Sequence, residues 1–400
     1  MNIVVLGGAG HMGSHAVRHL ATLPFVQDLV IGDRDMDGAR KLAEIVGKKA
    51  RAARVDVTDP EQLAAAMADA DAVVSTVGPF FRLGSTVLDA ALNQGCHYVD
   101  ICDDPAPTME LLSRDATARQ ANVSAIVGAG ASPGISNLLA LKAMQGLDEI
   151  DSVITGWGTG GKEEPTEHAH NGASAAIEHW VAQLVGTIPI HDRGQQVQGK
   201  PMQPIQIRLP GSAPLTAYTV GHPEPVTLPH YFPAIRHSIN VFDVPNAVLV
   251  LLEETVRAIT SGRLAVHEAS RMLTGALYGG ELGPGGIWSA VRAGAAAARD
   301  RVTKRNYLPQ IFALVTGKRA GRRETRAALL NGYIPGGLGA ITCIPTTIAL
   351  TMLAEGEITR TGAFAPEAGI DPDRFFTRLA PYVVRDRASE DEGPVRLLVE

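Results

Sequence analysis

The sequence has few cysteines, and they form no recognisable pattern. Of the 400 residues only three are cysteine, and Cys96, Cys102 and Cys343 include no CxxC pair. An odd number of unpatterned cysteines favours a reducing compartment over a disulfide framework, so we expect a cytoplasmic protein. Because a strand is predicted to begin at Asn2, we also expect no signal peptide.

The chain also lacks an excess of positive charge and a long hydrophobic run. It carries 36 lysines and arginines against 42 aspartates and glutamates, which gives a formal net charge of -6. One short basic block at 317–323 gives no extended positive surface, so nucleic acid is not an expected partner. The most apolar segment, 340–353, is shorter than the roughly 20 residues that span a bilayer. It contains Pro345 and predicts a buried helix, so no membrane contact is expected.

What the sequence does contain, over residues 1–130, is an alternation of short β-rich runs with amphipathic helical runs. This pattern is typical of a parallel sheet with crossover helices. The predicted fold class is therefore α/β, with a Rossmann-type doubly wound parallel sheet. Six strands are predicted there, at 3–7, 29–33, 52–57, 72–77, 98–102 and 124–130.

After residue 130 the pattern changes, and glycines, prolines and strand-like runs become dense. A chain of this length is long enough for two hydrophobic cores. We predict a second, mixed α/β domain over 131–338 that binds substrate, with a helical insertion at about 245–305 that would either cap the site or join two copies in a homodimer. A hairpin is expected at 311–330, and 339–400 is expected to return to the first domain.

The first predicted turn carries the spacing GxGxxG at Gly8, Gly10 and Gly13, between a strand and a helix. In dinucleotide-binding proteins the first glycine makes a tight turn, the second lets the backbone approach the pyrophosphate, and the third lets helix and strand pack. Amide groups at the helix start then face the phosphates. The alternative is that these glycines only shape a tight joint in a sheet that binds nothing.

The end of the second predicted strand bears on the choice between NAD and NADP. Asp33 lies 20 residues beyond Gly13 and would accept hydrogen bonds from the ribose hydroxyls. Its charge would repel a 2′-phosphate, which favours NAD. The neighbouring Arg34 could stack on adenine or pair with a 2′-phosphate, so NADP stays possible. Asp56 and Val57, at the end of the third strand, would border the adenine.

Ligands of open α/β sheets bind beyond the carboxyl ends of the strands. After the fifth predicted strand, Asp103 is our first candidate for acid–base catalysis, with Tyr98 and Asp100 as orienting neighbours. The alternative for Asp100 is a structural carboxylate that caps a loop. Cys102 has no base partner in the sequence and is expected to be a small buried residue.

Several longer segments carry a family resemblance. They are GGAGHMG, VGPFFRLGSTVLDAALNQGCHYVDICDD, GASPGISNLLA and, less specifically, GHPEPVTLP and AEGEITRTGAFAPEAGIDPDRFF. In these segments the chain resembles the saccharopine dehydrogenase-like family of NAD(P)-dependent oxidoreductases, relatives of lysine 6-dehydrogenases and carboxynorspermidine dehydrogenases. The resemblance implies a Rossmann-type domain interrupted by a substrate domain, and hydride transfer between nicotinamide and an amine or imine carbon of an amino-acid or polyamine-like substrate. It implies cofactor contacts at Gly8, Gly10, His11, Met12, Asp33, Asp56, Thr76, Gly78 and Pro79.

The resemblance implies no common proton-relay residue, so further candidates come from the sequence itself. His170 lies in TEHAHNG beside a second histidine and is another candidate relay. No third metal ligand stands at a recognisable spacing, so we expect no metal. Arg236 or Arg208 could bind a substrate carboxylate through two parallel hydrogen bonds. His222 and Glu224 stand in GHPEP, where the prolines predict a rigid loop.

Two alternatives to an amine dehydrogenase stay open. One is a redox sensor or scaffold that binds the dinucleotide without turnover, and the other is a dehydrogenase of a hydroxy compound. A dehydrogenase of the short-chain type is disfavoured, because it would need a tyrosine four residues before a lysine. None of the seven tyrosines has a lysine at that position.

Overall fold

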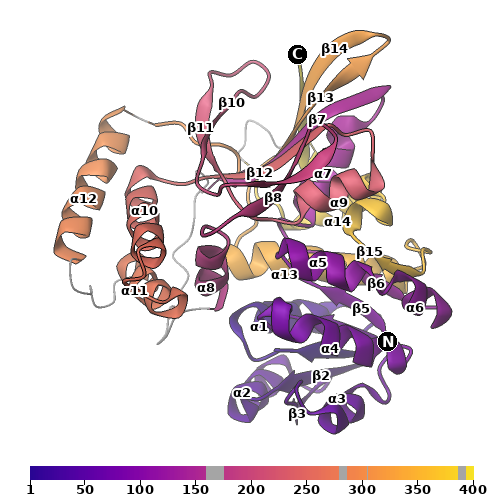
Figure 1. Ribbon diagram of the computed structural model, residues 1–400. Coiled ribbons are helices and arrows are strands. Elements are labelled where there is room, and N and C mark those ends of the chain that lie inside the picture. Colours follow the sequence, from indigo (N-terminus) through magenta and orange to yellow (C-terminus); the bar gives the residue numbers. More distant parts are fainter. Residues whose placement is uncertain (159–174, 279–285, 304, 386–392) are drawn as a thin grey trace.

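The computed structural model describes residues 1–158, 175–278, 286–303, 305–385 and 393–400, which form two β-sheets with helices around them (Figure 1). The first sheet has seven strands, all parallel, in the order β15-β6-β5-β4-β1-β2-β3. Its strands are β1 (Asn2–Leu6), β2 (Asp28–Asp33), β3 (Ala50–Arg54), β4 (Ala72–Ser75), β5 (His97–Asp100), β6 (Ser124–Ile126) and β15 (Gly362–Phe364). The predicted α/β class with a doubly wound parallel sheet is confirmed.

Alternating side chains give this sheet two buried faces. Along β1, Ile3 and Val5 point to one face and Val4 and Leu6 to the other, as the two-residue period of a strand requires. The first face is covered by α1 (His11–Thr22), α2 (Met36–Val46) and α13 (Gly337–Ala354). The second face is covered by α3 (Pro60–Met67), α4 (Phe80–Asn93) and α5 (Pro105–Leu112). After α5 comes α6 (Asp115–Gln120), which leads into β6.

The second sheet is mixed, and Figure 1 shows it beyond the carboxyl edge of the first. Its main order is β10-β11-β12-β7-β13-β14-β16, with the β8–β9 hairpin attached to β12. The central β7 is parallel to β12 and antiparallel to β13. The strands are β7 (Glu149–Gly158), β8 (Ile188–Asp192), β9 (Gln195–Gly199), β10 (Pro204–Ile207), β11 (Leu215–Thr219), β12 (His237–Asp243), β13 (Ile311–Arg319), β14 (Arg322–Leu330) and β16 (Val395–Val399).

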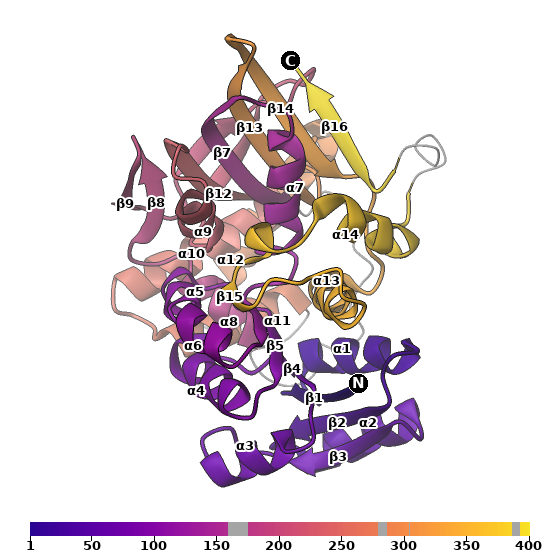
Figure 2. The ribbon, with the colours of Figure 1, turned by 90° about the vertical axis from the view of Figure 1, so that its right-hand side faces the viewer.

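Helices join and flank the two sheets. Two of them, α7 (Ile135–Met144) and α9 (Glu224–Tyr231), pack on the second sheet between it and the first domain (Figure 2). Within the predicted insertion lie α10 (Asn246–Thr260), α11 (Val266–Tyr278) and α12 (Gly286–Thr303), and α11 packs against α8 (Ala175–Ala182). The remaining helices are α14 (Pro372–Leu379) and two short 3-10 turns, Pro366–Ala368 and Ala380–Tyr382.

The C-terminal part of the chain divides between the two sheets. Helix α13 is long and apolar enough to cross a membrane, but about two thirds of it is buried, and it packs along α1. The strand that follows, β15, pairs with β6 of the first sheet. The last strand, β16, pairs instead with β14 of the second sheet. Of the segment 339–400 that was expected to return to the first domain, only the part through β15 extends its sheet.

Several strands of the first sheet end earlier than the sequence predicts, and the difference is largest for β3 and β6. Strand β3 ends at Arg54, because Asp56 turns the chain by accepting hydrogen bonds from the backbone and hydroxyl of Thr58. Strand β6 ends at Ile126, shortly before Gly128, which has a φ of +78°. The residues that follow these ends therefore lie in loops at the carboxyl edge, where side chains can converge.

Candidate functional site

The glycine turn after β1 has the geometry of a phosphate-binding turn. Gly7 adopts a φ of +73°, and its N–H donates to the carbonyl of Gly32 at 2.9 Å. A Cβ on Gly13 would lie 2.1 Å from the carbonyl oxygen of Gly7, so only glycine lets α1 pack this closely. A Cβ on Gly8 would lie 2.8 Å from the side chain of Ile31. These contacts give Gly8 and Gly13 the tight-turn and packing roles that the spacing predicts.

The start of α1 is open to an anion. Gly10 precedes the helix, no side chain caps it, and its first turn contains His11 and Met12 but no acid. The first amide groups of a helix have no intrahelical acceptors, so they and the helix dipole favour a negative group. Thr76, just after β4, donates its hydroxyl to the carbonyl of Leu6 at 3.0 Å and holds the turn in place. Residues 7–13 therefore fit a pyrophosphate.

Asp33 stands at the end of β2 and is already bound to the backbone of this turn. Its Oδ2 accepts from the N–H of Ala9 at 2.9 Å, and its Oδ1 accepts from the N–H of Asp35 at 3.0 Å. The carboxylate therefore helps to fix the glycine turn. Each oxygen retains a second lone pair for a ribose hydroxyl.

An open hollow beside the end of β2 is rich in arginine. Three arginines from different elements face it: Arg34 after β2, Arg40 in α2 and Arg54 at the end of β3. The full lining is Arg34, Asp35, Met36, Asp37, Arg40 and Arg54. Arg40 also lies 3.7 Å from Asp37 across an exposed ion pair. This positive hollow is where the adenosine end of a dinucleotide would lie if the pyrophosphate sat at α1.

Asp56 and Val57 lie beyond the end of β3. Hydrogen bonds from the side chain and backbone of Thr58 hold the pKa of Asp56 below its usual range. Val57 is buried. The two residues thus form the loop that borders this side of the sheet, where the sequence placed them against an adenine.

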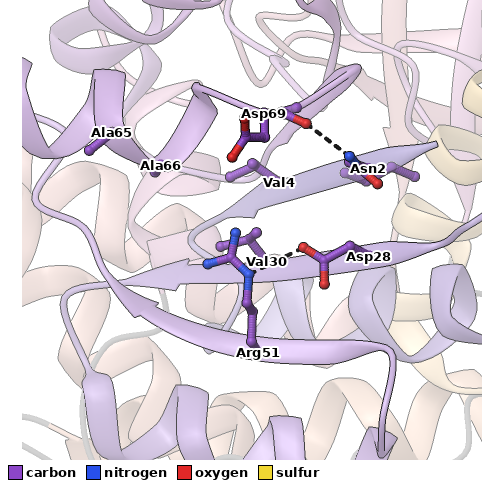
Figure 3. Close-up of a pocket in the computed structure, with 10 residues that line it drawn as sticks. Asn2, Val4, Asp28, Val30, Arg51, Ala65, Ala66 and Asp69 are labelled. Atoms are coloured by element: carbon purple, nitrogen blue, oxygen red, sulfur yellow. Dashed lines mark hydrogen bonds and ion pairs between the residues drawn. The ribbon is translucent and has the colours of Figure 1, made fainter.

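A second hollow lies at the opposite, amino-terminal edge of the same sheet (Figure 3). There the Arg51 side chain extends toward Asp28, with Nε 3.2 Å from Oδ2, and Asn2 donates to the carbonyl of Asp69 at 3.0 Å. Ligands of open α/β sheets bind at the carboxyl edge, so this hollow is the less suitable of the two.

Gly78 and Pro79 lie in the short loop between β4 and α4 and are joined by a cis peptide bond. Pro79 is the cap residue of α4, and a Cβ on Gly78 would meet no atom within 4 Å. The backbone here is open on its outer side, as a close approach to a cofactor requires.

Asp100 and Tyr98 are part of the interior and not of an open surface. Both are fully buried, and the Asp100 carboxylate accepts from the hydroxyl of Tyr98 at 2.9 Å. It also accepts from the N–H groups of Cys102 at 3.1 Å and Gly128 at 2.7 Å. Burial raises the pKa of Asp100 to about 6 despite these three donors. The geometry favours the loop-capping alternative, because this carboxylate ties the loop after β5 to the loop after β6.

Asp103 is held in an ion pair that the sequence did not indicate. His179 of α8 lies between two carboxylates, with Nδ1 2.9 Å from Asp103 and Nε2 2.8 Å from Asp104. Burial opposes the charged imidazolium, but the two carboxylates outweigh it and raise the pKa of His179 to about 10. Burial alone would raise the pKa of Asp103, yet the His179 charge and hydrogen bond hold it below its usual range. We call Asp103, Asp104 and His179 the closed cluster.

The closed cluster has three potential metal-ligand atoms within 4.8 Å of one another. A metal would need a neutral ring nitrogen, whereas both nitrogens of His179 face carboxylates that favour the protonated ring. An imidazolium between two carboxylates therefore accounts for this arrangement.

A second group of polar side chains, which we call the relay cluster, consists of Ser132, His222 and Glu224. Ser132 lies in the loop after β6, His222 lies in the loop that enters α9, and Glu224 is the first residue of that helix. Ser132 Oγ donates to Glu224 Oε1 at 2.5 Å and lies 3.1 Å from His222 Nδ1. His222 is 6% exposed and Glu224 is fully buried. The loop after β6 and the entry to α9 thus meet at the carboxyl edge of the first sheet.

Neighbouring polar residues complete the surroundings of Glu224. Its Oε1 also accepts from Ser136 at 2.6 Å and from the Asn240 amide at 2.9 Å. Asn137 donates to Glu367 at 2.8 Å, and burial raises the pKa of Glu367 to about 7. Sequence reasoning noted His222 and Glu224 only as part of a rigid loop. The available signal was a histidine and a glutamate between prolines, which the fold places opposite a serine that follows a strand.

Two other candidates, Arg208 and Arg236, are not joined to these clusters by any hydrogen bond or ion pair among the described residues. Arg208 lies 3.4 Å from Glu400 in an exposed ion pair. Arg236 is exposed at the start of β12. His170 lies outside the described residues.

Comparisons with known proteins agree with this architecture. Residues 3–126 match the family model for the saccharopine dehydrogenase NADP binding domain. Apo saccharopine dehydrogenase (L-Glu forming) from Saccharomyces cerevisiae is 15% identical over 100% of this chain and 99% of that chain, with a TM-score of 0.62. This likeness shows a shared fold. It extends over both domains.

Two further structures are similar at lower scores. GenD2 from gentamicin A biosynthesis, in complex with NAD, is 12% identical over 100% of this chain and 96% of its own, with a TM-score of 0.39. Serine dehydrogenase from Escherichia coli is 12% identical over 32% of this chain and 81% of its own, with a TM-score of 0.26. Neither adds to the fold assignment.

Proposed function

We propose that this protein is an amine-oxidising or imine-reducing dehydrogenase, because its first domain is of the saccharopine dehydrogenase-like NAD(P)-binding family. It would transfer a hydride between nicotinamide and a carbon that bears nitrogen in an amino-acid or polyamine-like substrate. The observation that carries the proposal is the open start of α1 behind a packed glycine turn, at the sheet edge where both polar clusters lie. Such an edge is where α/β enzymes bind their ligands.

The residues of the turn fit a dinucleotide. The amide groups in the first turn of α1 would hold the pyrophosphate, and the loop at Gly78 and Pro79 would border the nicotinamide half. When bound, the cofactor supplies the hydride donor or acceptor. The protein's own contribution is to orient the substrate carbon, exclude bulk water and hold or move a proton.

For the cofactor, the hollow beside β2 supports NADP over the NAD that Asp33 alone would favour. The Asp33 carboxylate is engaged by two backbone N–H groups, while Arg34 and Arg54 offer guanidinium groups on the same side. Arginine binds phosphate through charge-assisted hydrogen bonds, which are the stronger kind. We therefore propose that Arg34 and Arg54 bind the 2′-phosphate of NADP.

Titration of protein fluorescence with NADPH and NADH tests this cofactor assignment without turnover. NADPH should bind more tightly, and Arg34→Ala should weaken NADPH about 10-fold or more while changing NADH little, because a charged hydrogen bond contributes about 1.5–3 kcal/mol. Arg51→Ala is the matched control, since Arg51 lies at the opposite edge of the sheet. Tighter binding of NADH, or an equal loss for both cofactors, would contradict the assignment.

The reaction itself is tested by following the near-ultraviolet absorbance of reduced nicotinamide. Purified protein with NADP or NAD would be given L-lysine, cadaverine, putrescine and saccharopine, with hydroxy acids as the comparison set. Turnover of an amine supports the proposal. Turnover of hydroxy acids alone favours a hydroxy-compound dehydrogenase, and binding without any turnover favours a sensor or scaffold.

A further inference from the structure

We propose that His222 is the residue that exchanges a proton with the substrate nitrogen, and that Ser132 and Glu224 hold its ring in the orientation for this exchange. The inference rests on the proposed dehydrogenase function and adds the acid–base residue to it. Ser132 and Glu224 are positioning residues, because they act through His222 and not on the substrate.

The location of His222 suits this role. It lies between β11 and α9, at the carboxyl edge of the first sheet, opposite the loop that follows β6. Both segments reach the same edge as the glycine turn and the loop at Gly78. At 6% exposure the ring is shielded from bulk water, as a group that handles protons beside a hydride transfer should be.

The hydrogen bonds fix which ring nitrogen carries the proton. A serine hydroxyl has one proton to donate, and that of Ser132 goes to Glu224 Oε1 at 2.5 Å. Ser132 Oγ must therefore act as acceptor toward His222 Nδ1 at 3.1 Å, so Nδ1 carries a hydrogen. In the neutral ring, Nε2 is then the acceptor. No hydrogen bond or ion pair among the described residues occupies it.

Glu224 supplies a fixed negative charge behind the ring. Three donors converge on its Oε1, from Ser132, Ser136 and Asn240, and this is the environment of a carboxylate anion. Its Oε2 lies 3.8 Å from His222 Nδ1 and has no hydrogen-bond partner among the described residues. When Nε2 takes a proton, the imidazolium that forms is stabilised by this charge, as a buried carboxylate does for other catalytic histidines.

The proton balance is simple. In the oxidative direction the substrate ammonium loses one proton: its N–H bond breaks and an Nε2–H bond forms on His222. The nitrogen lone pair thus released would assist loss of hydride from the adjacent carbon, for which the oxidised dinucleotide, when bound, would be the acceptor, and the substrate would become an iminium. In the reductive direction the imidazolium returns its proton to the amine. Asp103 is less suited, because it is bound to a histidine whose pKa is raised to about 10.

The first test compares His222→Gln with the wild type, using the amine from the panel that gives the highest rate. We expect kcat to fall about 100- to 10,000-fold, the usual contribution of general acid–base catalysis. The pH profile should lose the limb that the histidine governs, while NADPH binding stays within about two-fold. In His222→Ala, added imidazole should restore part of kcat.

A matched serine pair provides the second test. Ser132 and Ser136 donate to the same oxygen of Glu224, but only Ser132 contacts His222. Ser132→Ala should therefore lower kcat much more than Ser136→Ala. Nitrogen-15 spectra of the imidazole give a readout without turnover: the wild type should show hydrogen on Nδ1, and Ser132→Ala should disturb that signal more than Ser136→Ala.

The outcomes separate this role from the proposed function. If the wild type oxidises amines and His222→Gln does so at a similar rate, or if the hydrogen is found on Nε2, the role of His222 is overturned and the function stands. A wild type that binds NADPH but turns over no amine overturns both. If His222→Gln folds poorly, the serine pair decides the question.

Discussion

His179 of the closed cluster and His222 of the relay cluster both lie at the carboxyl edge of the first sheet. They differ in how many ring nitrogens face a partner, and this decides whether each can exchange a proton. His179 presents both ring nitrogens to carboxylates, Asp103 at 2.9 Å and Asp104 at 2.8 Å. Among the residues that the structure describes, His222 has only Nδ1 engaged, by Ser132 and at longer range by Glu224. A ring saturated by carboxylates keeps its proton, whereas a ring with one free nitrogen can give and take one.

The carboxylates of the two clusters also differ in how closely each is paired with its histidine. Asp103 is neutralised by its histidine, and together they fasten α8 of the second domain to the loop after β5. Glu224 lies farther from its histidine, with Oε2 3.8 Å from His222 Nδ1, and Ser132 bridges its Oε1 to the ring. In the mechanism that we propose, the closed cluster attaches α8 to the first domain and the relay cluster exchanges the proton, although both combine a histidine with carboxylate at the same edge.

The largest expected effect is on turnover, where variants of the relay cluster and of the closed cluster should differ most. Glu224→Gln keeps an oxygen for the three donors but removes the charge behind His222, so we expect kcat on the best amine to fall about 10- to 100-fold. Asp103→Asn, at the closed cluster, should lower kcat far less. Steady-state rates with saturating NADPH or NADP measure both. If Asp103→Asn were the more damaging variant, the roles of the two clusters would be exchanged.

The first domain could be predicted from the sequence because its signals are local. Alternation of strands and helices, the spacing of Gly8, Gly10 and Gly13, and Asp33 all lie within one short stretch of chain, and the parallel sheet is confirmed. The clusters could not be predicted in this way. Ser132 and His222 are 90 residues apart, and Asp103 and His179 are 76 apart.

The partners of each carboxylate could not be predicted from the sequence either. Asp100 and Asp103 stand three residues apart, and the sequence predicts Asp103 as the first acid–base candidate and Asp100 as its orienting neighbour or a loop cap. Only packing shows that Asp100 is sealed inside with three donors while Asp103 meets a histidine from another domain. Choosing a proton relay requires such partners, because the same side chain can cap a loop, fix an ion pair or exchange a proton.

A smaller effect concerns stability. His179→Gln leaves Asp103 and Asp104 facing each other without a cation, and we expect a loss of about 2 kcal/mol in the free energy of unfolding. This is below the roughly 3–5 kcal/mol of a fully buried pair, because the three side chains are 15–33% exposed. Urea unfolding at neutral pH measures it.

The matched control for this variant is His237→Gln. His237 pairs with Asp192 at 2.8 Å, but the two side chains are 41% and 46% exposed. Such surface pairs contribute about 0–1 kcal/mol, so little change is expected. Equal losses in the two variants would mean that the closed cluster fastens nothing.

The smallest effect is the pH dependence of the difference in unfolding free energy between wild type and His179→Gln. Its sign follows from the raised pKa of His179. The pKa of His179 is raised from 6.5 to about 10 in the folded protein, so its contribution to stability is fully present below about pH 6.5 and is lost as the pH rises through about 10. The gap in unfolding free energy between wild type and His179→Gln should therefore narrow from about pH 6 through 8 to 10. His237→Gln, measured alongside, gives the background of an exposed pair. A gap that widened with pH would mean that the ring is neutral in the fold, and His179 would then be as free to exchange protons as His222.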